Sequence, residues 1–225
     1  MTGVPKPLRT AVGLKALMAV SGIVLFGFVL GHMFGNLKLY QGPETLNAYA
    51  EHLRTMGEPI LPRNALLWVV RAALLAAVGV HLWSAWSTTR QSWAARGGRY
   101  EVWTPVQADY AARTMRWGGV LIALFVVFHL ADLTWGTARP EFVTGEVYRN
   151  LVTSFQRVPV AVFYMIANLA LGFHLFHGLW SLFQSLGWNN PKFNPWRRTF
   201  ATAFACIVTA GNLSFPLSVL MGWVK

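Results

Sequence analysis

Histidine offers most of the chemistry available to this chain, and five of its six histidines lie within long apolar segments. Polar side chains inside a membrane are rare and are functional candidates by default. A single buried histidine can simply bond a neighbouring helix, but one in each of four consecutive segments favours a shared ligand. The five are His32, His81, His129, His174 and His177, whereas His52 lies in a polar stretch and is expected to be an ordinary surface residue.

Other redox and metal chemistry has little support in the sequence. Cys206 is the only cysteine, so neither a four-cysteine iron–sulfur site nor a C-x-x-C-H haem attachment can form. No G-x-G-x-x-G or G-K-[ST] motif for a nucleotide occurs. Metal transport sites usually recruit carboxylates, and Asp132 is the only carboxylate within the apolar segments. Histidine must therefore carry any redox or ligand chemistry.

The histidines are positioned by segments long enough to cross a membrane, which takes about 20 mostly apolar residues. Of the 225 residues, 55% are hydrophobic and only 12% are charged. Such spans must be helical, because lipid offers no partners to backbone polar groups. The first segment is too long, and too polar at its end, for a cleaved signal peptide. The sequence predicts an all-α membrane protein, one domain over residues 1–225, with helices at about 13–34, 66–89, 117–136, 158–184 and 200–222.

Basic residues in the loops predict the orientation, because they gather on the cytoplasmic side. One side has eleven basic residues and two acids: Lys6, Arg9, Lys15, Arg90, Arg96, Arg99, Arg113, Arg116, Lys192, Arg197 and Arg198, with Glu101 and Asp109. The other has eight basic residues and six acids: Lys38, Arg54, Arg63, Arg71, Arg139, Arg149, Arg157 and Lys225, with Glu44, Glu51, Glu58, Asp132, Glu141 and Glu146. We therefore expect a cytoplasmic N-terminus and an external C-terminus. Most of the net charge of +11 then lies on the cytoplasmic face, where anionic lipid or an acidic partner could meet it, and needs no nucleic acid.

Depth divides the histidines into two levels. At the helical rise, His32 lies about 25 Å beyond Lys15 and His129 about 20 Å beyond Arg116, so both belong to the outer half. His81 is nine residues before Arg90 and His174 about thirteen before the polar turn "GWNNP", so both belong nearer the cytoplasmic half. Two imidazoles that face each other between helices can ligate a b-type haem. We expect one haem between His32 and His129 and another between His81 and His174.

His174 and His177 are three residues apart, which separates them by about 60° around the helix and about 4.5 Å along it. They cannot both be axial ligands of one iron from the same side. Gly178 shares a face with His174, so we expect His174 to be the ligand, with His177 bonding a haem propionate, a quinone or a neighbouring helix. Nearby glycines favour a bulky planar guest, although small residues also serve helix packing: Gly27, Gly31, Gly35, Gly79, Gly172 and Gly178.

Two strings resemble a known family. They are "KALMAVSGIVLFGFVLGHMFGNLKLYQGPETLNAYA" and "FHLFHGLWSLFQSLGWNNP", the second being similar to the pattern H-x-x-[HN]-G-x-W-S. Nearly the whole chain resembles the five-helix dihaem cytochrome b membrane anchors of succinate dehydrogenase and fumarate reductase complexes. The resemblance implies the same haem pairs, His32 with His129 (outer) and His81 with His174 (inner). Certain relatives carry a glutamate two residues before the last ligand, where this chain has Gly172.

The resemblance also implies a function. A flavoprotein subunit would oxidise succinate, and an iron–sulfur subunit docked on the cytoplasmic face would pass electrons through the inner and outer haems to menaquinone or ubiquinone. The chain would then be the membrane subunit of respiratory complex II in a bacterial plasma membrane, within a complex that could form a higher oligomer. Candidate propionate partners on the inner side, which could equally be ordinary edge charges, are Arg90, Arg113, Arg116 and His177.

Three alternatives stay open at this point. The same anchor could serve fumarate reduction. A dihaem cytochrome b could belong to another quinone-linked enzyme, such as a hydrogenase or a formate dehydrogenase. A haem-free transporter or structural anchor would use the histidines only for contacts between helices.

Overall fold

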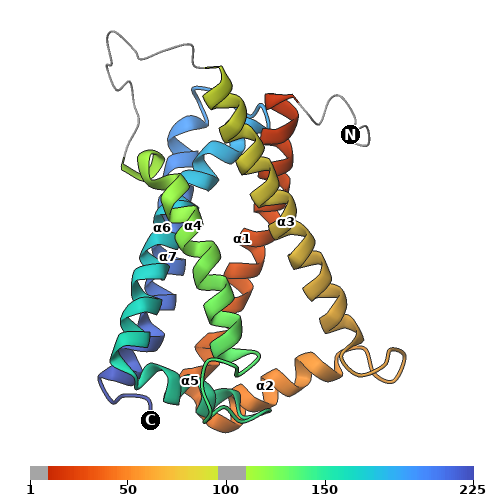
Figure 1. Ribbon diagram of the computed structural model, residues 1–225, viewed down its shortest axis with the longest axis vertical. Helices are drawn as coiled ribbons and strands as arrows, with labels where there is room; N and C mark the ends of the chain where they lie inside the picture. The colour runs from red at the N-terminus through yellow and green to blue at the C-terminus, as the bar shows by residue number, and fades with distance from the viewer. Residues whose placement is uncertain (1–9, 96–109) are drawn as a thin grey trace.

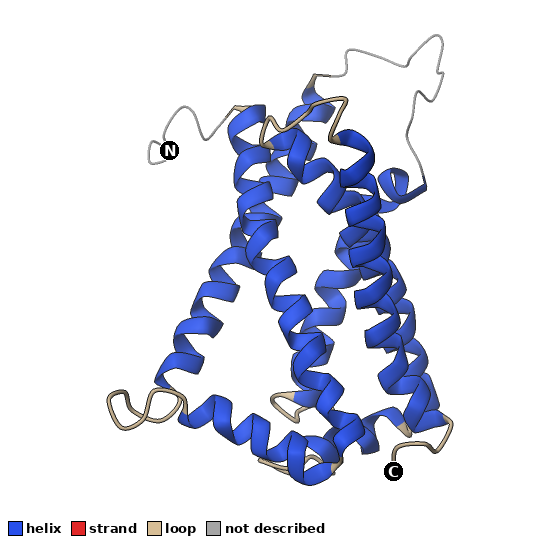
Figure 2. Ribbon diagram, turned by 180° about the vertical axis from the view of Figure 1, so that it is seen from behind, coloured by secondary structure: helices blue, strands red, loops and turns tan. Residues whose placement is uncertain are grey.

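The computed structural model describes residues 10–95 and 110–225, and every regular element within these ranges is a helix (Figures 1 and 2). Five helices are long and apolar enough to cross a membrane. They are α1 (Ala11–Asn36), α3 (Ala65–Ala94), α4 (Tyr110–Leu133), α6 (Val158–Ser185) and α7 (Asn194–Leu220). The predicted all-α fold with five spans is confirmed, and the chain is a multi-pass membrane protein.

Several predicted charges lie outside the described residues: Lys6, Arg9, Arg96, Arg99, Glu101 and Asp109. The side chain of Arg113 is likewise outside the described part, although its backbone belongs to α4. With five crossings, α1 begins at one end of the bundle and the chain finishes at the other (Figure 1). These are called the N-terminal end and the C-terminal end below.

Three shorter elements at the C-terminal end were not predicted. They are a 3-10 helix, η2 (Leu37–Gln41), and two α-helices, α2 (Pro43–Thr55) and α5 (Val147–Phe155). Figure 1 shows α2 running across this end of the bundle from α1 towards the foot of α3. Such short, partly polar helices lack the long apolar run that marks a membrane span, so hydropathy does not predict them.

The predicted helix ends differ most from the structure at three places: α3 ends at Ala94 rather than 89, α4 begins at Tyr110 rather than 117, and α7 begins at Asn194 rather than 200. The predicted helix at 117–136 ends at Leu133, because the N–H groups of Thr134 and Trp135 both bond the Leu130 carbonyl and Gly136 follows with φ +72°. The predicted helix at 200–222 covers Asn194–Leu220 instead, and Pro195 suits its first turn because that position needs no N–H donor. Hydropathy locates the apolar part of a helix, whereas capping decides where the helix stops.

The helices pack mainly as neighbours α1 with α3, α4 with α6, and α6 with α7. In the described residues, α1 and α4 make little or no close backbone contact, and the same holds for α3 and α6. Helices α3 and α4 are also the least covered, since 6% and 0% of their most apolar windows are buried, against 33% in α6 and 39% in α7. The bundle is therefore tight around α6 and α7, where α1 also packs, and it is open between α1 and α4 and between α3 and α6.

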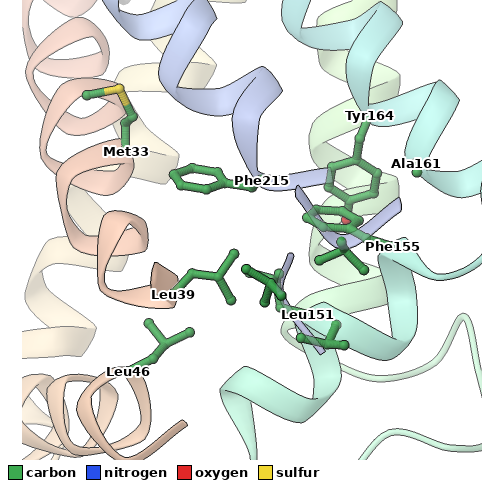
Figure 3. Close-up of a cluster of buried hydrophobic side chains, with 11 residues drawn as sticks. Met33, Leu39, Leu46, Leu151, Phe155, Ala161, Tyr164 and Phe215 are labelled. Carbon is green, nitrogen blue, oxygen red and sulfur yellow. The ribbon is translucent and has the colours of Figure 1, made fainter. Parts of the chain in front are cut away.

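Two apolar clusters hold this arrangement. The larger lies at the C-terminal end, where residues of α2 and α5 such as Leu46 and Phe155 join Phe215 of α7 and Tyr164 of α6 (Figure 3). The second lies between α6 and α7 and includes Leu175, Leu179, Ala201 and Val208. The first cluster anchors the short helices to the spans. The second makes α6, the helix of His174, a rigid support.

Candidate functional site

The structure brings four histidines together as two separate pairs. The ring centroids of His32 on α1 and His129 on α4 are 5.8 Å apart, with an interplanar angle of 89°. Those of His81 on α3 and His174 on α6 are 6.1 Å apart, with an angle of 60°. These are the pairs expected from depth along the helices. Each pair joins two helices that make little or no close backbone contact of their own.

The ring spacing fits a bis-histidine metal site. An imidazole nitrogen lies about 2 Å from a bound metal ion, so two rings that share one metal ion would have centres about 6 Å apart. The observed 5.8 Å and 6.1 Å agree with that value. Each pair therefore has the ring spacing that two histidines holding one metal ion would have.

Helices α1 and α4 each indicate how far apart the two histidine pairs lie along the bundle. A Cβ on Gly22 of α1 would lie 3.7 Å from the His81 ring, and His32 follows ten residues later. A Cβ on Gly119 of α4 would lie 3.9 Å from the His174 ring, and His129 also follows ten residues later. Ten residues of helix span about 15 Å. The pairs therefore form two distinct sites, one above the other in the bundle.

His81 has a defined orientation. Its Nδ1 lies 3.2 Å from the carbonyl oxygen of Met18 and 3.3 Å from Ser21 Oγ. The Ser21 hydroxyl donates to the carbonyl of Leu17 at 2.8 Å, so its oxygen is available to His81. A proton on Nδ1 donating to these acceptors leaves the Nε2 lone pair free for a ligand, as is usual for metal-bound histidine. Sequence reasoning missed Ser21 and Met18, because no local pattern links residues about 60 positions apart.

The other rings of the two pairs are incompletely satisfied by the chain itself. Within the described residues, Nδ1 of His129 and Nδ1 of His174 are buried and have no hydrogen-bond partner. The side chain of His32 is exposed, and the side chains of His81, His129 and His174 are only partly buried by the rest of the chain. Buried polar atoms of this kind normally have a partner. Because protein atoms leave the four rings partly uncovered, they suit a guest that covers their faces, as a b-type haem would.

The glycines expected to leave room for such a guest divide into two groups. A Cβ would meet no atom within 4 Å at Gly27, Gly31, Gly79 and Gly178. The prediction is wrong for the other two, which serve helix packing. A Cβ on Gly35 would approach the Tyr49 ring of α2 to 2.8 Å, and one on Gly172 would overlap Thr209 of α7.

The structure describes the side chains of three predicted propionate partners, His177, Arg90 and Arg116, but not that of Arg113. The His177 ring contacts Trp180, with centroids 6.4 Å apart. Arg90 is exposed, and Arg116 is exposed with its guanidinium 5.8 Å from the centre of the Trp93 ring. Their role, like that of Arg113, stays a prediction. His52 is exposed on α2, in agreement with its expected surface position.

A charged cluster beside the His32–His129 pair was missed, although Asp132 had stood out as the one carboxylate within a predicted span. Asp132 is fully buried near the end of α4. It accepts hydrogen bonds from Ser154, from Tyr164 at 3.0 Å and from Arg157 at 2.9 Å. Arg139 Nε lies 3.4 Å from the same carboxylate. Burial lowers the pKa of the Arg139 guanidinium, and the charge of Asp132 opposes that change.

Asp132, Arg139, Ser154, Arg157 and Tyr164 are called the Asp132 cluster below. This cluster contacts the His32–His129 pair through the Tyr164 ring. The Tyr164 ring lies 5.9 Å from the His129 ring, centroid to centroid, while its hydroxyl bonds Asp132. His129 and Asp132 are three residues apart and so lie on neighbouring positions of one helix face. The cluster therefore fixes the surroundings of His129 from the C-terminal end.

Comparison with known families gives one match. A family model described as the succinate dehydrogenase/fumarate reductase transmembrane subunit matches residues 101–213, which is half of the chain. The matched part includes His129, His174 and His177 but neither α1 nor α3. No curated protein and no solved structure matches the chain.

Proposed function

The chain belongs to the succinate dehydrogenase/fumarate reductase transmembrane subunit family, and we propose that it is the cytochrome b membrane anchor of a succinate:quinone oxidoreductase. The family consists of membrane subunits of these complexes, so a flavoprotein subunit and an iron–sulfur subunit are the implied partners. We place both on the cytoplasmic face, at the N-terminal end of the bundle, where basic residues outnumber acids in the sequence. The membrane would be a bacterial plasma membrane.

His32 and His129 would hold one b-type haem, and His81 and His174 the other. The two haems would supply one-electron carriers between the iron–sulfur subunit at the N-terminal end and membrane quinone. The ring spacings support this assignment. The chain itself has no group suited to oxidising succinate, so that reaction belongs to the flavoprotein.

The residues around the pairs would hold the ligands in place. The contacts of His81 with Met18 and Ser21 keep its ring facing α6. The glycines with open surroundings, such as Gly178, leave room beside the rings. The apolar walls of the spans exclude water from both levels. His177, one turn from His174, would support the same site without ligating iron.

The observation that carries the proposal is the position of the two pairs. Each lies between helices that otherwise make little or no close contact, and each has the ring spacing of axial ligands. Family membership favours this enzyme class over a hydrogenase or formate dehydrogenase. We propose succinate oxidation as the physiological direction, with fumarate reduction by the same anchor as the alternative.

The test is the haem content of the purified complex. We expect b-type bands in a reduced-minus-oxidised spectrum, two haems per chain, bound flavin and succinate–quinone reductase activity. His174→Ala and His81→Ala should each leave one haem, and so should His129→Ala. His177→Ala should keep two haems with altered redox behaviour, and His52→Ala serves as the surface control.

Three results would each contradict a different part of the proposal. Absence of b-type bands rejects both the haems and the electron route. Loss of haem in His177→Ala with retention in His174→Ala rejects the choice of ligand. Normal haem content without flavin or succinate-dependent reduction rejects the enzyme class.

A further inference from the structure

The Asp132 cluster contains more positive than negative charge. Two guanidinium groups, those of Arg139 and Arg157, approach the single carboxylate of Asp132. The side chain of Arg139 is only 1% exposed. Glu141 is exposed and is the weakest of the electrostatic influences on Arg139. Burying a charge without its counterion is costly, so this excess calls for an anion.

The cluster also has hydrogen-bond donors to spare. Arg139 Nη1 donates to Thr153 Oγ1 at 2.7 Å. Within the part of the chain that the structure describes, its Nη2 and Nε are buried without a hydrogen-bond partner, and so is Nε of Arg157. Leaving a buried N–H without an acceptor costs more than a hydrogen bond normally contributes. At least one further acceptor is therefore expected beside Arg139.

Asp132 is poorly placed to supply that acceptor. Its Oδ2 already accepts from Ser154 and Tyr164, and its Oδ1 accepts from Arg157. Arg139 Nε lies at ion-pair distance from Oδ1 but does not form a hydrogen bond with it. The remaining donors need an oxygen from outside these side chains, and an ionised oxygen would form the stronger bonds.

We propose that Arg139 and Arg157 form an anion-binding site for a carboxylate or phosphate group at the C-terminal end of the bundle. A haem propionate is one source, and in that form the inference rests on the proposed function. His129 is three residues, about 4.5 Å along the helix axis, from Asp132, so a haem held by His129 would lie close to the cluster. A lipid phosphate is the other source, since this end of the spans lies at a membrane surface.

The experiment compares Arg139→Gln and Arg157→Gln with Arg149→Gln in the purified complex. Arg149 is exposed on α5, at the same end of the molecule, and so provides the same change of charge outside the cluster. Resonance Raman spectra report hydrogen bonding of the haem propionates through their bending bands. Native mass spectrometry counts the phospholipids that stay bound.

A propionate source predicts that a propionate band shifts in the Arg139 and Arg157 variants and stays in place in Arg149→Gln. A phosphate source predicts loss of a bound phospholipid in the same two variants, with unchanged bands. Asp132→Asn increases the positive excess and should retain the anion. Because Arg157 is 40% exposed, its variant should fold even where Arg139→Gln does not.

The inference is overturned if Arg157→Gln changes neither the propionate bands nor the lipid count while two haems remain bound. The cluster would then only join the loop after α4 to α5 and α6. A complex without b-type haem contradicts the proposed function instead, and the lipid count alone then decides whether the anion site exists.

Discussion

Gly172 and Gly178 lie on the same helix, α6, but alanine should affect them in opposite ways. A Cβ on Gly172 would overlap the Thr209 hydroxyl of α7 and lie 3.3 Å from the Thr209 Cβ. A Cβ on Gly178, on the face of His174, would meet no protein atom within 4 Å. Gly172→Ala therefore tests packing between α6 and α7, and Gly178→Ala tests the room beside the histidine pair.

The magnitudes follow from two opposing effects. Alanine in place of glycine stabilises a helix interior by about 0.5–1 kcal/mol. Overpacking a tight contact costs about 1–3 kcal/mol. Gly178→Ala should thus leave the protein as stable or slightly more stable, while Gly172→Ala should lose up to about 2 kcal/mol. Adding Thr209→Ala to Gly172→Ala removes the obstructing hydroxyl and should recover most of that loss.

Thermal unfolding of the purified complex, followed together with haem content, separates these effects. We expect Gly172→Ala to unfold at a lower temperature with two haems still bound. Gly178→Ala should lose or perturb the haem at His81 and His174, and its unfolding temperature should fall only where that haem is lost. The reasoning fails if Gly172→Ala keeps its stability and loses haem, because Gly172 would then face the cofactor rather than α7.

Three further substitutions test contacts that the structure shows. Arg197→Gln removes a buried guanidinium that bonds the loop after α6, and should cost about 1.5–3 kcal/mol in unfolding, whereas exposed Arg198→Gln should have little effect. Equal unfolding midpoints for the two would contradict this. Asn150→Ala removes two hydrogen bonds to the Val143 backbone, at 2.9 Å and 2.6 Å, so hydrogen exchange in the loop after α4 should accelerate; unchanged exchange would show that other contacts hold it. Gly35→Ala would place a Cβ 2.8 Å from a tyrosine ring of α2 and should expose α2 to proteases, with wild-type resistance as the contrary result.

Much of the fold was predictable because lipid restricts the backbone so strongly. A long apolar run has no alternative to a helix in a membrane, so the five spans followed from the position of the apolar runs along the sequence. The helix ends could not be predicted in this way. Local hydrogen bonds end α4 at Leu133, and a proline in the first turn favours the start of α7 at Asn194. The short helices α2 and α5 were missed because they lie outside the apolar runs.

The histidine pairs were predictable for a similar reason. Depth along a straight helix follows from residue number, and depth was enough to match His32 with His129 and His81 with His174. Their role as haem ligands stays a prediction, supported by ring spacings of 5.8 Å and 6.1 Å. Ser21 beside His81 could not be foreseen, because it depends on how α1 and α3 are rotated against each other.

By itself, then, the sequence determined how many helices cross the membrane and how deep each histidine lies. Only the tertiary structure decided which face of each helix meets which neighbour. A span that is apolar all round has no amphipathic stripe to indicate its rotation, so Gly172 and Gly178 look alike in sequence. The partners of Asp132 come from three different segments, and only the packing of those segments around α4 brings two arginines to one carboxylate.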